Sequence, residues 1–475
     1  MNKVLFVTSE AHPLIKTGGL ADVAGSLPKA LTELSQDVRL IIPHYQAITQ
    51  DAHYRCTVRV DNRDVNILET QLPETNVPVW LVECPDLYNT PGNPYVDENG
   101  EPWENIAERF AVYCRIAVEI AMGRTELDWN ADIVHCNDWQ SGLVPALLSL
   151  EEQAPKTVFT IHNLAYQGLF PPVTYHALNL PGQLWNPNGL EFHEMLSFIK
   201  GGLTYSDRIT TVSPTYALEI QTPEFGYGLE GLLSHRQDIL SGIINGIDMD
   251  DWNPKTDPNL PQSYDVSSLD KKQTNKTELQ KQLGLPVNAE TPVLGVVSRL
   301  VQQKSVDLLI EIIPEMMTMP IQLILLGSGD SNLERELNSF SRLYPDKISV
   351  TIGYDEKLAH LIEAGADVFL MPSRFEPCGL NQMYSQRYGT IPIVRYTGGL
   401  ADTVIDALPE TLADNTASGI VFNEATAGSF QEAMKRCLIL FNDKKSWQKM
   451  QKAGMKKDFS WKNSAKQYLD LYQSM

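Results

Sequence analysis

The sequence predicts an α/β protein with two doubly wound parallel sheets, and three observations support this prediction. The chain has 475 residues, which exceeds one ordinary hydrophobic core and fits two domains of roughly 200 residues or more. Short apolar runs rich in β-branched residues recur along it, with helix-like stretches between them. The hexapeptide Thr-Gly-Gly-Leu-Ala-Asp occurs twice, at Thr17–Asp22 and at Thr397–Asp402. Each copy lies between a strand-like and a helix-like run, which suggests two similar halves.

The predicted strands are continuously apolar rather than alternating, as expected for strands that helices cover on both faces of a parallel sheet. In the first half they are Val4–Thr8, Val38–Ile42, Val79–Val82, Ile133–His135, Val158–Ile161 and Arg208–Val212. In the second half they are Val293–Val297, Leu323–Leu326, Ile348–Ile352, Val368–Met371, Ile391–Val394 and Gly419–Phe422. We therefore expect one sheet in each half.

Helix-like segments and turn clusters complete the expected organisation. The segments are Leu20–Leu34, Thr426–Asn442, Ser446–Gly454 and Ser460–Gln473. Pro28 falls inside the first of them, so this helix is either kinked or begins later. Turn residues cluster at Asn245–Pro254 and polar residues continue to Ser268, which indicates a domain boundary. We expect one domain at 1–245, a second at 246–458, and a C-terminal helix at 459–475 that can cross back to the first.

Composition and charge limit the kinds of partner. Acidic residues exceed basic ones by 59 − 38 = 21, so the surface repels nucleic acid and anionic membranes. An anionic ligand would need a local cluster of basic side chains. No apolar run approaches the ~20 residues that span a bilayer, and the start of the chain indicates no signal peptide. The six cysteines show no Cys-x-x-Cys pairing, so we expect neither a zinc site nor disulfides, and a cytoplasmic location.

The two glycine-containing hexapeptides are candidate anion sites. A glycine pair between a strand and a helix lets backbone N–H groups converge on an oxyanion, and the helix N-terminus adds partial positive charge. Lys16 precedes the first copy and Tyr396 precedes the second, which suggests different roles. A tight turn with a solvated lysine explains the first copy equally well.

Polar residues also follow two predicted strands of the second half. Ser298–Lys304 follows Val293–Val297 and carries Arg299 and Lys304, two cations that could meet one diphosphate. Ser373–Gln382 follows Val368–Met371 and combines a carboxylate, a thiol, a glycine and two amides. Ligands of open α/β sheets bind at the carboxyl ends of the strands, so both clusters are candidate ligand sites. An exposed Arg/Lys pair remains the simpler explanation of the first cluster.

The first half offers sugar-binding side chains in the same position relative to its strands. His135–Trp139 ends one predicted strand, and Ile161–Gly168 follows the next. Both segments carry hydroxyl-binding groups and aromatic rings, although a lone histidine or Trp139 can equally be structural. The loop Leu87–Trp103 is long and rich in turn residues, which makes it a candidate for substrate contact. Gly327–Asn332 resembles a dinucleotide fingerprint only weakly, because Asn332 stands where the third glycine belongs.

Taken together, these motifs resemble the bacterial glycogen synthases and plant starch synthases of glycosyltransferase family 5. The matching segments run in family order from about residue 1 to residue 460: Lys16–Val23, Asp138-Trp139, His162–Gly168, Ser213–Tyr216, Ser298–Lys304, Ser373–Gln382 and Thr397–Val404. The resemblance implies a GT-B fold, in which two Rossmann-like domains face a deep cleft. It also implies retaining transfer of glucose from ADP-glucose to the non-reducing 4-OH of an α-1,4-glucan, without a metal ion or other cofactor.

The resemblance carries roles to individual residues. The catalytic group would be Glu376, Arg299, Lys304, His162 and Asp138. The donor-binding group would be Lys16, Gly18, Gly19, Arg299, Lys304, Tyr354, Cys378, Gly379, Leu380, Thr397, Gly398 and Gly399. The acceptor-binding group would be Asp22, Asn137, Asp138, Trp139, Tyr166 and Tyr95. In this scheme the cations neutralise the departing ADP, and Glu376 holds the glucose while favouring positive charge at its anomeric carbon.

The chain departs from the family pattern at a few positions. Asn137 stands where bacterial members commonly have histidine. The segment Cys-Asn-Asp-Trp looks more like that of the granule-bound starch synthases, which leaves the acceptor preference open. Ser305 stands where glycine usually follows the lysine. Tyr384 lies eight positions after Glu376, where many related GT-B enzymes have a second glutamate, and this favours family 5. The alternatives are a transferase that uses UDP-glucose and a small acceptor, a silent glucan-binding module and, least supported, a nicotinamide oxidoreductase. Oligomeric state is left open.

Overall fold

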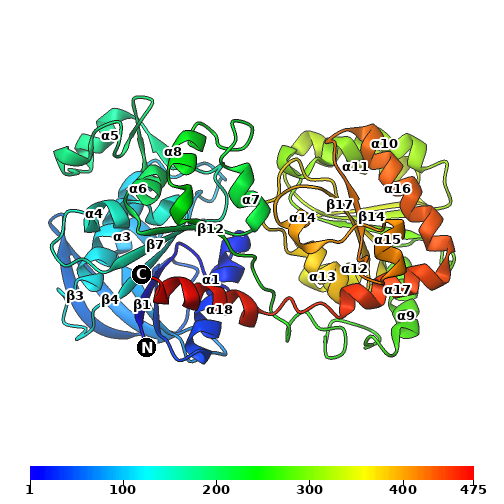
Figure 1. Cartoon of the computed structure of the whole chain (residues 1–475), viewed down its shortest axis with the longest axis horizontal. Helices are drawn as coiled ribbons and strands as arrows, with labels where there is room; N and C mark the ends of the chain where they lie inside the picture. The colour runs from blue at the N-terminus through cyan, green and yellow to red at the C-terminus, as the bar shows by residue number, and fades with distance from the viewer. The chain divides into compact units, whose positions relative to one another are not determined.

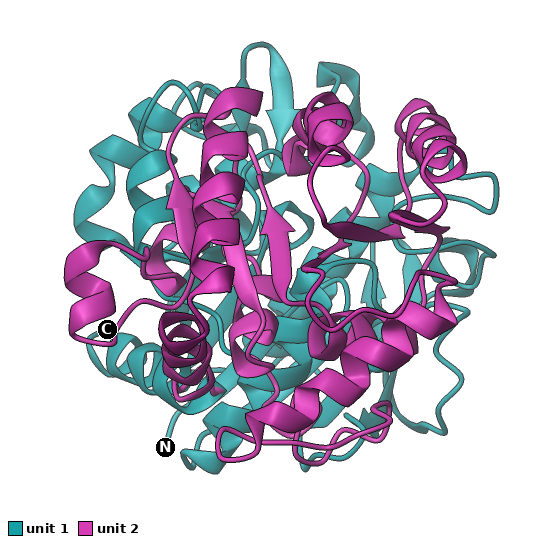
Figure 2. Cartoon of the chain, turned by 90° about the vertical axis from the view of Figure 1, so that its right-hand side faces the viewer, with its two compact units in different colours: residues 1–246, 461–475 teal, residues 247–460 magenta.

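The computed structural model describes residues 1–475, which fold into two compact units (Figure 1). Unit 1 comprises Met1–Gly246 together with Trp461–Met475, and unit 2 comprises Ile247–Ser460 (Figure 2). The chain thus leaves unit 1 once and returns to it with its last helix. The predicted α/β architecture with two parallel-sheet domains is confirmed.

Unit 1 contains a nine-stranded sheet with the order β12-β11-β7-β6-β1-β2-β5-β4-β3. Its strands are β1 Lys3–Val7, β2 Asp37–Pro43, β3 His53–Val60, β4 Arg63–Gln71, β5 Pro78–Glu83, β6 Ile133–Asn137, β7 Lys156–Ile161, β11 Arg208–Thr211 and β12 Leu240–Gly242. All pairings are parallel except those of β3 with β4 and of β4 with β5. The six strands predicted for this half are all present within one or two residues.

The antiparallel strands β3 and β4 and the edge strand β12 were not predicted. In β3 exposed and buried residues alternate, because one face of this edge hairpin meets solvent. A search for continuous apolar runs therefore misses it. A small separate sheet of β8 Leu169–Phe170, β10 Met195–Ser197 and β9 Glu191–Phe192 was also missed, since strands this short carry no periodicity.

Helices surround the sheet of unit 1. They are α1 Gly19–Glu33, α2 Pro85–Tyr88, α3 Ile106–Ala121, α4 Leu143–Leu148, α5 Pro172–Ala177, α6 Phe198–Tyr205, α7 Pro214–Glu219, α8 Glu230–His235 and α18 Trp461–Gln473. The hydroxyl of Tyr472 in α18 forms a hydrogen bond of 2.6 Å with Nδ1 of His135 in β6. This helix packs along α1, which Figure 1 shows in red beside blue. The C-terminal segment is thus part of the core of unit 1.

Pro28 lies inside α1 without ending it. The helix begins at Gly19, so the prediction that it begins later is wrong. Proline removes one backbone N–H donor from the helix, and the carbonyl oxygen of Pro28 itself accepts a hydrogen bond from the hydroxyl of Thr32 at 2.9 Å. The buried apolar face of the helix, which includes Leu27 and Leu31, stabilises it across this position.

Unit 2 contains a six-stranded, fully parallel sheet with the order β15-β14-β13-β16-β17-β18. The strands are β13 Val293–Val297, β14 Gln322–Gly327, β15 Ile348–Ile352, β16 Val368–Met371, β17 Ile391–Arg395 and β18 Ile420–Phe422, all at their predicted places. Counted from the first strand of the unit, this is the order 3-2-1-4-5-6 of dinucleotide-binding folds. Along β14, Leu323 and Leu325 pack into one apolar cluster and Ile324 and Leu326 into another, because helices cover both faces.

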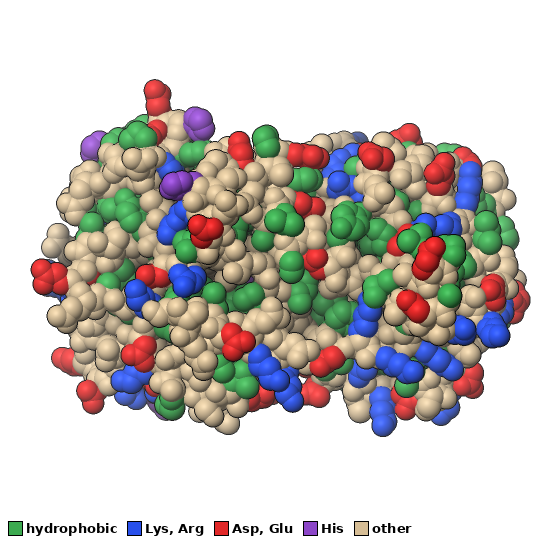
Figure 3. Space-filling view, in the orientation of Figure 1, with side chains coloured by type: hydrophobic (Ala, Val, Ile, Leu, Met, Phe, Trp, Pro, Cys, Tyr) green, Lys and Arg blue, Asp and Glu red, His purple; other side chains and the backbone are tan.

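The helices of unit 2 are α9 Lys272–Gln282, α10 Val306–Met316, α11 Ser331–Leu343, α12 Glu356–Gly365, α13 Asn381–Arg387, α14 Gly398–Thr403, α15 Pro409–Ala413, α16 Ala427–Asn442 and α17 Lys444–Met455. The predicted helices near the end of the chain are confirmed as α16, α17 and α18. None of the helices in the chain is long and apolar enough to cross a membrane. On the face drawn in Figure 3, Lys and Arg side chains gather over the lower part of unit 2, although the whole chain carries a net charge of −21.

Candidate active site

In unit 2, the loops that follow β13 and β16 leave the sheet at its switch point, where the strand order reverses. Strand β13 pairs with β14 on one side and with β16 on the other. The connections after β13 and after β16 turn to opposite faces of such a sheet, which leaves a crevice between their first residues. Lys304 lies in the first loop and Glu376 in the second, so the strand order explains why these two predicted residues meet.

Lys304 and Glu376 form an ion pair at this switch point. The ammonium nitrogen of Lys304 lies 2.5 Å from Oε2 of Glu376, and their side chains are 18% and 7% exposed. The hydroxyl of Ser373 donates to the same carboxylate oxygen at 3.0 Å. A pair this poorly solvated interacts more strongly than a surface pair, so both groups are held in fixed positions.

The loop that carries Glu376 is held by the second glycine hexapeptide. A Cβ on Gly398 would lie 2.0 Å from the carbonyl oxygen of Glu376, and one on Gly399 would lie 2.0 Å from that of Cys378. Gly398 also has a φ of +42°, in the region that favours glycine. The N–H of Gly399 donates to the carbonyl oxygen of Glu376 at 3.1 Å. These glycines therefore allow two backbone segments to touch and fix the loop.

The other donor-binding candidates of unit 2 differ in exposure. Cys378 and Thr397 are buried, whereas Arg299 is exposed. Tyr354 is 79% exposed, beyond the end of β15. Gly379 has a φ of +71°, so the turn before Leu380 needs glycine. Ser305 has a φ of +55°, in the region that favours glycine, and this explains why the family usually has glycine at this position.

In unit 1, the switch point lies between β1 and β6, and the loop after β1 contains a carboxylate that the sequence analysis missed. Glu10 is 3% exposed. One of its oxygens accepts hydrogen bonds from the N–H and hydroxyl of Thr17 at 2.5 and 2.7 Å, and from the N–H of Gly18 at 3.2 Å. The predicted convergence of loop amides on an oxyanion is therefore present, but the oxyanion here is Glu10. Burial raises the pKa of Glu10 against the lowering effect of these hydrogen bonds.

Glu10 also connects the first glycine loop to the predicted substrate loop. The hydroxyl of Tyr95 donates to the second oxygen of Glu10 at 3.0 Å. Lys16 forms an ion pair with Asp22 at 2.6 Å, with side chains 39% and 24% exposed. No heavy atom outside the neighbouring residues lies within 4 Å of a Cβ built on Gly18 or Gly19. The two copies of the hexapeptide thus have opposite surroundings: the second copy is packed against backbone and the first is open.

Asp138 follows β6 at the same switch point. It is 8% exposed, and its Oδ1 accepts the N–H of His162 at 2.7 Å. Burial raises the pKa of Asp138 to about 7, although hydrogen bonds from the backbone of His162 and Asn163 oppose the shift. Its φ of 54° is unusual for a residue other than glycine and costs about 1–3 kcal/mol. Such strain and such a shifted pKa are typical of functional sites.

His162 is held in one tautomer by Asn137. The amide nitrogen of Asn137 donates to the carbonyl oxygen of Val7 at 3.0 Å, so its amide oxygen faces Nε2 of His162 at 2.9 Å. Because this oxygen can only accept, Nε2 carries the proton and Nδ1 keeps its lone pair. Burial lowers the pKa of His162 to about 3, so the ring is neutral at physiological pH. His162 can therefore accept a hydrogen bond from a sugar hydroxyl.

The remaining acceptor candidates divide into buried and exposed residues. Trp139 is buried, and its ring lies 5.1 Å from that of Phe110 and 6.1 Å from that of Phe198, measured between centroids. A Cβ on Gly168 would lie 2.3 Å from the Trp139 ring, so this glycine makes room for it. Tyr166 is 51% exposed. Trp139 accordingly has the surroundings of a core residue, and Tyr166 presents a solvent-facing ring near His162 in sequence.

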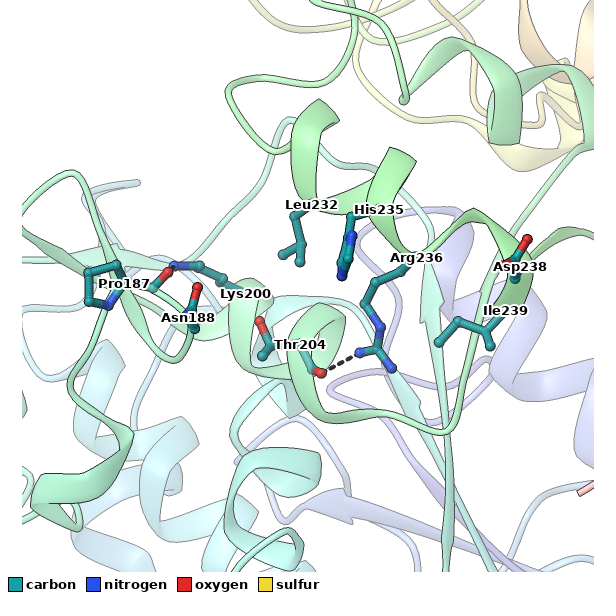
Figure 4. A pocket seen from close by; sticks show the side chains of 9 residues that line it. All are labelled: Pro187, Asn188, Lys200, Thr204, Leu232, His235, Arg236, Asp238 and Ile239. Carbon is teal, nitrogen blue, oxygen red and sulfur yellow. Dashed lines mark hydrogen bonds between the residues drawn. The ribbon is translucent and has the colours of Figure 1, made fainter.

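A separate cavity of about 850 Å³ lies elsewhere in unit 1 (Figure 4). Its basic side chains are already engaged by backbone. Lys200 donates to the carbonyl oxygen of Pro187 at 2.5 Å, and Arg236 donates to the carbonyl oxygens of Leu203 and Thr204. None of the predicted site residues lines this cavity; its lining is Pro187, Asn188, Lys200, Thr204, Leu232, His235, Arg236, Asp238 and Ile239.

Comparison with known proteins relates both units of the chain to glycosyltransferases. Residues 3–235 match the starch synthase catalytic domain, and residues 275–457 match the glycosyl transferases group 1. A glycogen synthase 1 of Methylococcus capsulatus is 55% identical over 473 residues, covering 99% of this chain and 96% of the relative. The chain belongs to the glycogen synthase family. A glycogen synthase of Thioalkalivibrio sulfidiphilus is 50% identical over 480 residues, covering 100% of this chain and 99% of the relative.

Solved structures agree with the family. The catalytic domain of starch synthase IV from Arabidopsis thaliana, bound to ADP and acarbose, has a TM-score of 0.89 and 33% identity, covering 100% of this chain and 99% of that one. Sucrose-phosphate synthase from Thermosynechococcus elongatus has a TM-score of 0.61 at 17% identity, which shows the shared GT-B fold. The activity is that of the family, elongation of α-1,4-glucan from ADP-glucose in glycogen biosynthesis. The resemblance found in the sequence is confirmed.

Proposed function

We propose that unit 2 binds ADP-glucose at the switch point between β13 and β16, and that unit 1 supplies the groups that bind the glucan acceptor. The observation that carries the proposal is the Lys304–Glu376 pair, which brings a cation and a carboxylate together at the carboxyl ends of two adjacent strands. The cation can bind the phosphates of a nucleoside diphosphate, and the carboxylate can accept hydrogen bonds from the hydroxyls of a glucosyl group.

In this proposal Lys304 and Arg299 neutralise the diphosphate as it leaves. A unit-charge pair at 4 Å is worth about 4 kcal/mol at an effective dielectric constant near 20. The negative charge on the departing ADP grows as the bond to the anomeric carbon breaks, so the two cations stabilise the transition state more than the ground state. The Cys378–Leu380 and Thr397–Gly399 segments would hold the glucosyl group and distal phosphate, and Tyr354 would lie beside the adenine.

Retention of configuration follows from attack on the same face that ADP leaves. Oε2 of Glu376 already accepts hydrogen bonds from Lys304 and Ser373, which makes this carboxylate a poor nucleophile. We therefore assign Glu376 to holding glucose and favouring the oxocarbenium-like charge. The bond from the anomeric carbon to the phosphate oxygen breaks, the bond to the acceptor O4 forms, and the acceptor proton passes to the departing phosphate oxygen.

Unit 1 provides complementary groups for the acceptor. The lone pair on Nδ1 of His162 and the carboxylate of Asp138 can each accept a hydrogen bond from a sugar hydroxyl. Tyr166 offers an exposed ring on which a sugar can stack, and we retain Asp22, Tyr95, Asn137 and Trp139 as residues that shape this site. Lys16 with Gly18 and Gly19 is proposed as a further diphosphate ligand, since the open surroundings of these glycines leave room for a ligand's close approach.

The test measures labelled glucose entering glycogen from ADP-glucose and from UDP-glucose. We expect incorporation from ADP-glucose, release of one ADP for each glucose added, and a product in which the new linkage is α-1,4. A glucan-binding module without activity would retain glycogen on an affinity gel yet release no ADP. Preferential use of UDP-glucose with a free sugar acceptor would favour the alternative transferase and overturn the proposal.

Location and partners stay proposals as well. All six cysteines are free and buried, as expected in a reducing compartment, and we propose a cytoplasmic enzyme. We propose ADP-glucose and glucan as its ligands, with no role for nucleic acid or membrane, in keeping with the net charge of −21. Catalysis is proposed to use cationic side chains rather than a metal ion at the diphosphate.

A further inference from the structure

Three metal-ligating side chains converge in unit 2, away from the strand-end loops that hold Lys304 and Glu376. Potential ligand atoms of Asp251, Glu356 and His360 all lie within 4.8 Å of one another. Glu356 is the first residue of α12, and His360 lies one helical turn later, on the same side of the helix. Asp251 comes from the turn in which Oδ1 of Asp248 accepts its N–H at 3.2 Å. The two carboxylates are exposed and the imidazole is buried.

One ring nitrogen of His360, Nδ1, has a hydrogen-bond partner, and the other, Nε2, points away from that partner. Nδ1 lies 2.8 Å from Oδ2 of Asp257, which also accepts the hydroxyl of Tyr388 at 2.6 Å. The other oxygen of Asp257 accepts the N–H of Asn259 at 2.8 Å, so the hydrogen bonds from Tyr388 and Asn259 both treat this side chain as an acceptor. Asp257 is therefore an acceptor, and Nδ1 of His360 carries a proton.

Nε2 of His360 is the second observation that points to a ligand. The His360 side chain is 1% exposed, and its Nε2 is a buried nitrogen without a hydrogen-bond partner. A neutral ring with its proton on Nδ1 has its lone pair on Nε2, where a metal ion would bind. An unpaired buried polar atom destabilises the folded state, and coordination would remove this cost.

The ring cannot easily turn to find another partner. Trp252 stacks on it at a centroid distance of 3.9 Å and an interplanar angle of 12°. Trp252 in turn stacks on Tyr384, at a centroid distance of 3.8 Å and an interplanar angle of 10°. His360 is thus held both by its Asp257 hydrogen bond and by an aromatic stack, as metal-binding histidines commonly are by a carboxylate behind them.

We propose that Asp251, Glu356 and Nε2 of His360 form a binding site for a divalent transition-metal ion of the zinc type. A nitrogen ligand beside two carboxylates suits Zn²⁺, whereas Mg²⁺ and Ca²⁺ prefer oxygen alone. The ligand atoms lie within 4.8 Å of one another, and a bound Zn²⁺ would draw each of them to roughly 2.1 Å from the ion. Bound metal would tie the segment containing Asp251 to α12.

The site has no part in the proposed transfer reaction, so its effect is on stability. A ligand that binds only the folded state raises the unfolding temperature in proportion to its binding free energy. Apart from this effect, we expect glucose transfer at 25 °C to be equal before and after treatment with EDTA. A zinc site was not expected from the sequence, because the six cysteines show no Cys-x-x-Cys pairing.

The experiment measures Zn²⁺ binding by calorimetry and thermal unfolding of the EDTA-treated full chain. We expect one tight site per chain and a rise of roughly 5 °C in the unfolding temperature of unit 2 at 100-fold excess over the dissociation constant. Mg²⁺ should produce no comparable rise. Asp251→Asn and Glu356→Gln should each weaken Zn²⁺ binding at least 10-fold, whereas the control Asp250→Asn, an exposed neighbour outside the group, should not.

Both carboxylate variants alter exposed side chains, so folding should be preserved. Absence of tight Zn²⁺ binding to the wild-type chain would overturn the proposal. Equal binding by the wild type and the Asp251→Asn/Glu356→Gln double variant would also overturn it, because the metal would then bind elsewhere on the acidic surface.

Discussion

At the scale of single residues, identical sequences serve different physical needs. The first Thr-Gly-Gly-Leu-Ala-Asp leaves Gly18 and Gly19 in open space, while the second presses Gly398 and Gly399 against the backbone of the Glu376 loop. The same six letters therefore indicate ligand approach in one place and close packing in the other. The sequence alone could not distinguish these, because the difference depends on which segment lies opposite.

The two copies offer a matched pair of substitutions. Gly399→Ala places a Cβ 2.0 Å from the carbonyl oxygen of Cys378, so we expect a loss of about 2–4 kcal/mol in unfolding free energy. Gly19→Ala meets no heavy atom and lies in the first turn of α1, so stability should be unchanged or slightly raised. It should nevertheless reduce activity if ADP-glucose approaches there. Urea unfolding and steady-state kinetics of both variants check this, and equal effects of the two on stability would contradict it.

Asp138 links stability to function. Because its folded pKa of about 7 exceeds the ordinary value of 3.8, the folded state keeps a proton that the unfolded state loses. Its contribution to stability is full below about pH 4 and is lost as the pH rises to about 7. Asp138→Asn should therefore be more stable than the wild type at pH 8, by roughly 1–3 kcal/mol, and less active. Urea unfolding at pH 4.5 and pH 8 measures this; a stability difference that does not grow with pH would refute it.

Asn137 can be tested through the titration of its neighbour. Asn137→Asp places a carboxylate beside Nε2 of His162, which raises the pKa of the imidazole from its lowered value of about 3. The protonated ring cannot accept a hydroxyl at Nδ1, so we expect kcat/KM of the variant to fall more steeply than that of the wild type on the acid side of the profile. Because Asp138, with its pKa of about 7, titrates in both proteins, the comparison rests on the difference between their rate profiles from pH 5 to pH 9. Parallel profiles for the two proteins would show that Asn137 does not act through His162.

At the scale of elements, the loops after β13 and β16 were predictable and the loop after β1 only in part. Continuous apolar strands and the rule for strand ends were enough to single out Lys304 and Glu376. Their direct pairing needed the order of strands, which no local pattern contains. Glu10 was missed because a lone glutamate nine residues before the helix that begins at Gly19 has no signature until the chain folds back. The hairpin β3–β4 was missed because its alternating pattern differs from that of buried strands.

The strand-end loops of unit 2 should contribute most of the rate enhancement. We expect Lys304→Ala and Glu376→Ala each to lower kcat about 100-fold or more, equivalent to roughly 2.7 kcal/mol of transition-state stabilisation. Lys435→Ala is the matched control, since Lys435 forms an exposed ion pair with Glu315, with both side chains about half exposed. Initial rates at saturating ADP-glucose measure the effect. Near-normal turnover in both loop variants would remove these residues from the reaction.

At the scale of the whole molecule, the two units repeat one design. Each is a doubly wound sheet with poorly solvated ionisable side chains where the strand order reverses: Glu10 and Asp138 in unit 1, and Lys304 and Glu376 in unit 2. A chain with a net charge of −21 binds an anionic donor only where cations are gathered locally. This repeated placement is the basis on which we propose where the chemistry takes place in each unit.

A crystal structure of the chain with ADP tests the central claim most directly. We predict diphosphate oxygens within hydrogen-bonding distance of the Lys304 ammonium group, beside the carboxyl ends of β13 and β16. ADP bound instead in the cavity lined by Lys200 and Arg236, with no density near Lys304, would contradict the account.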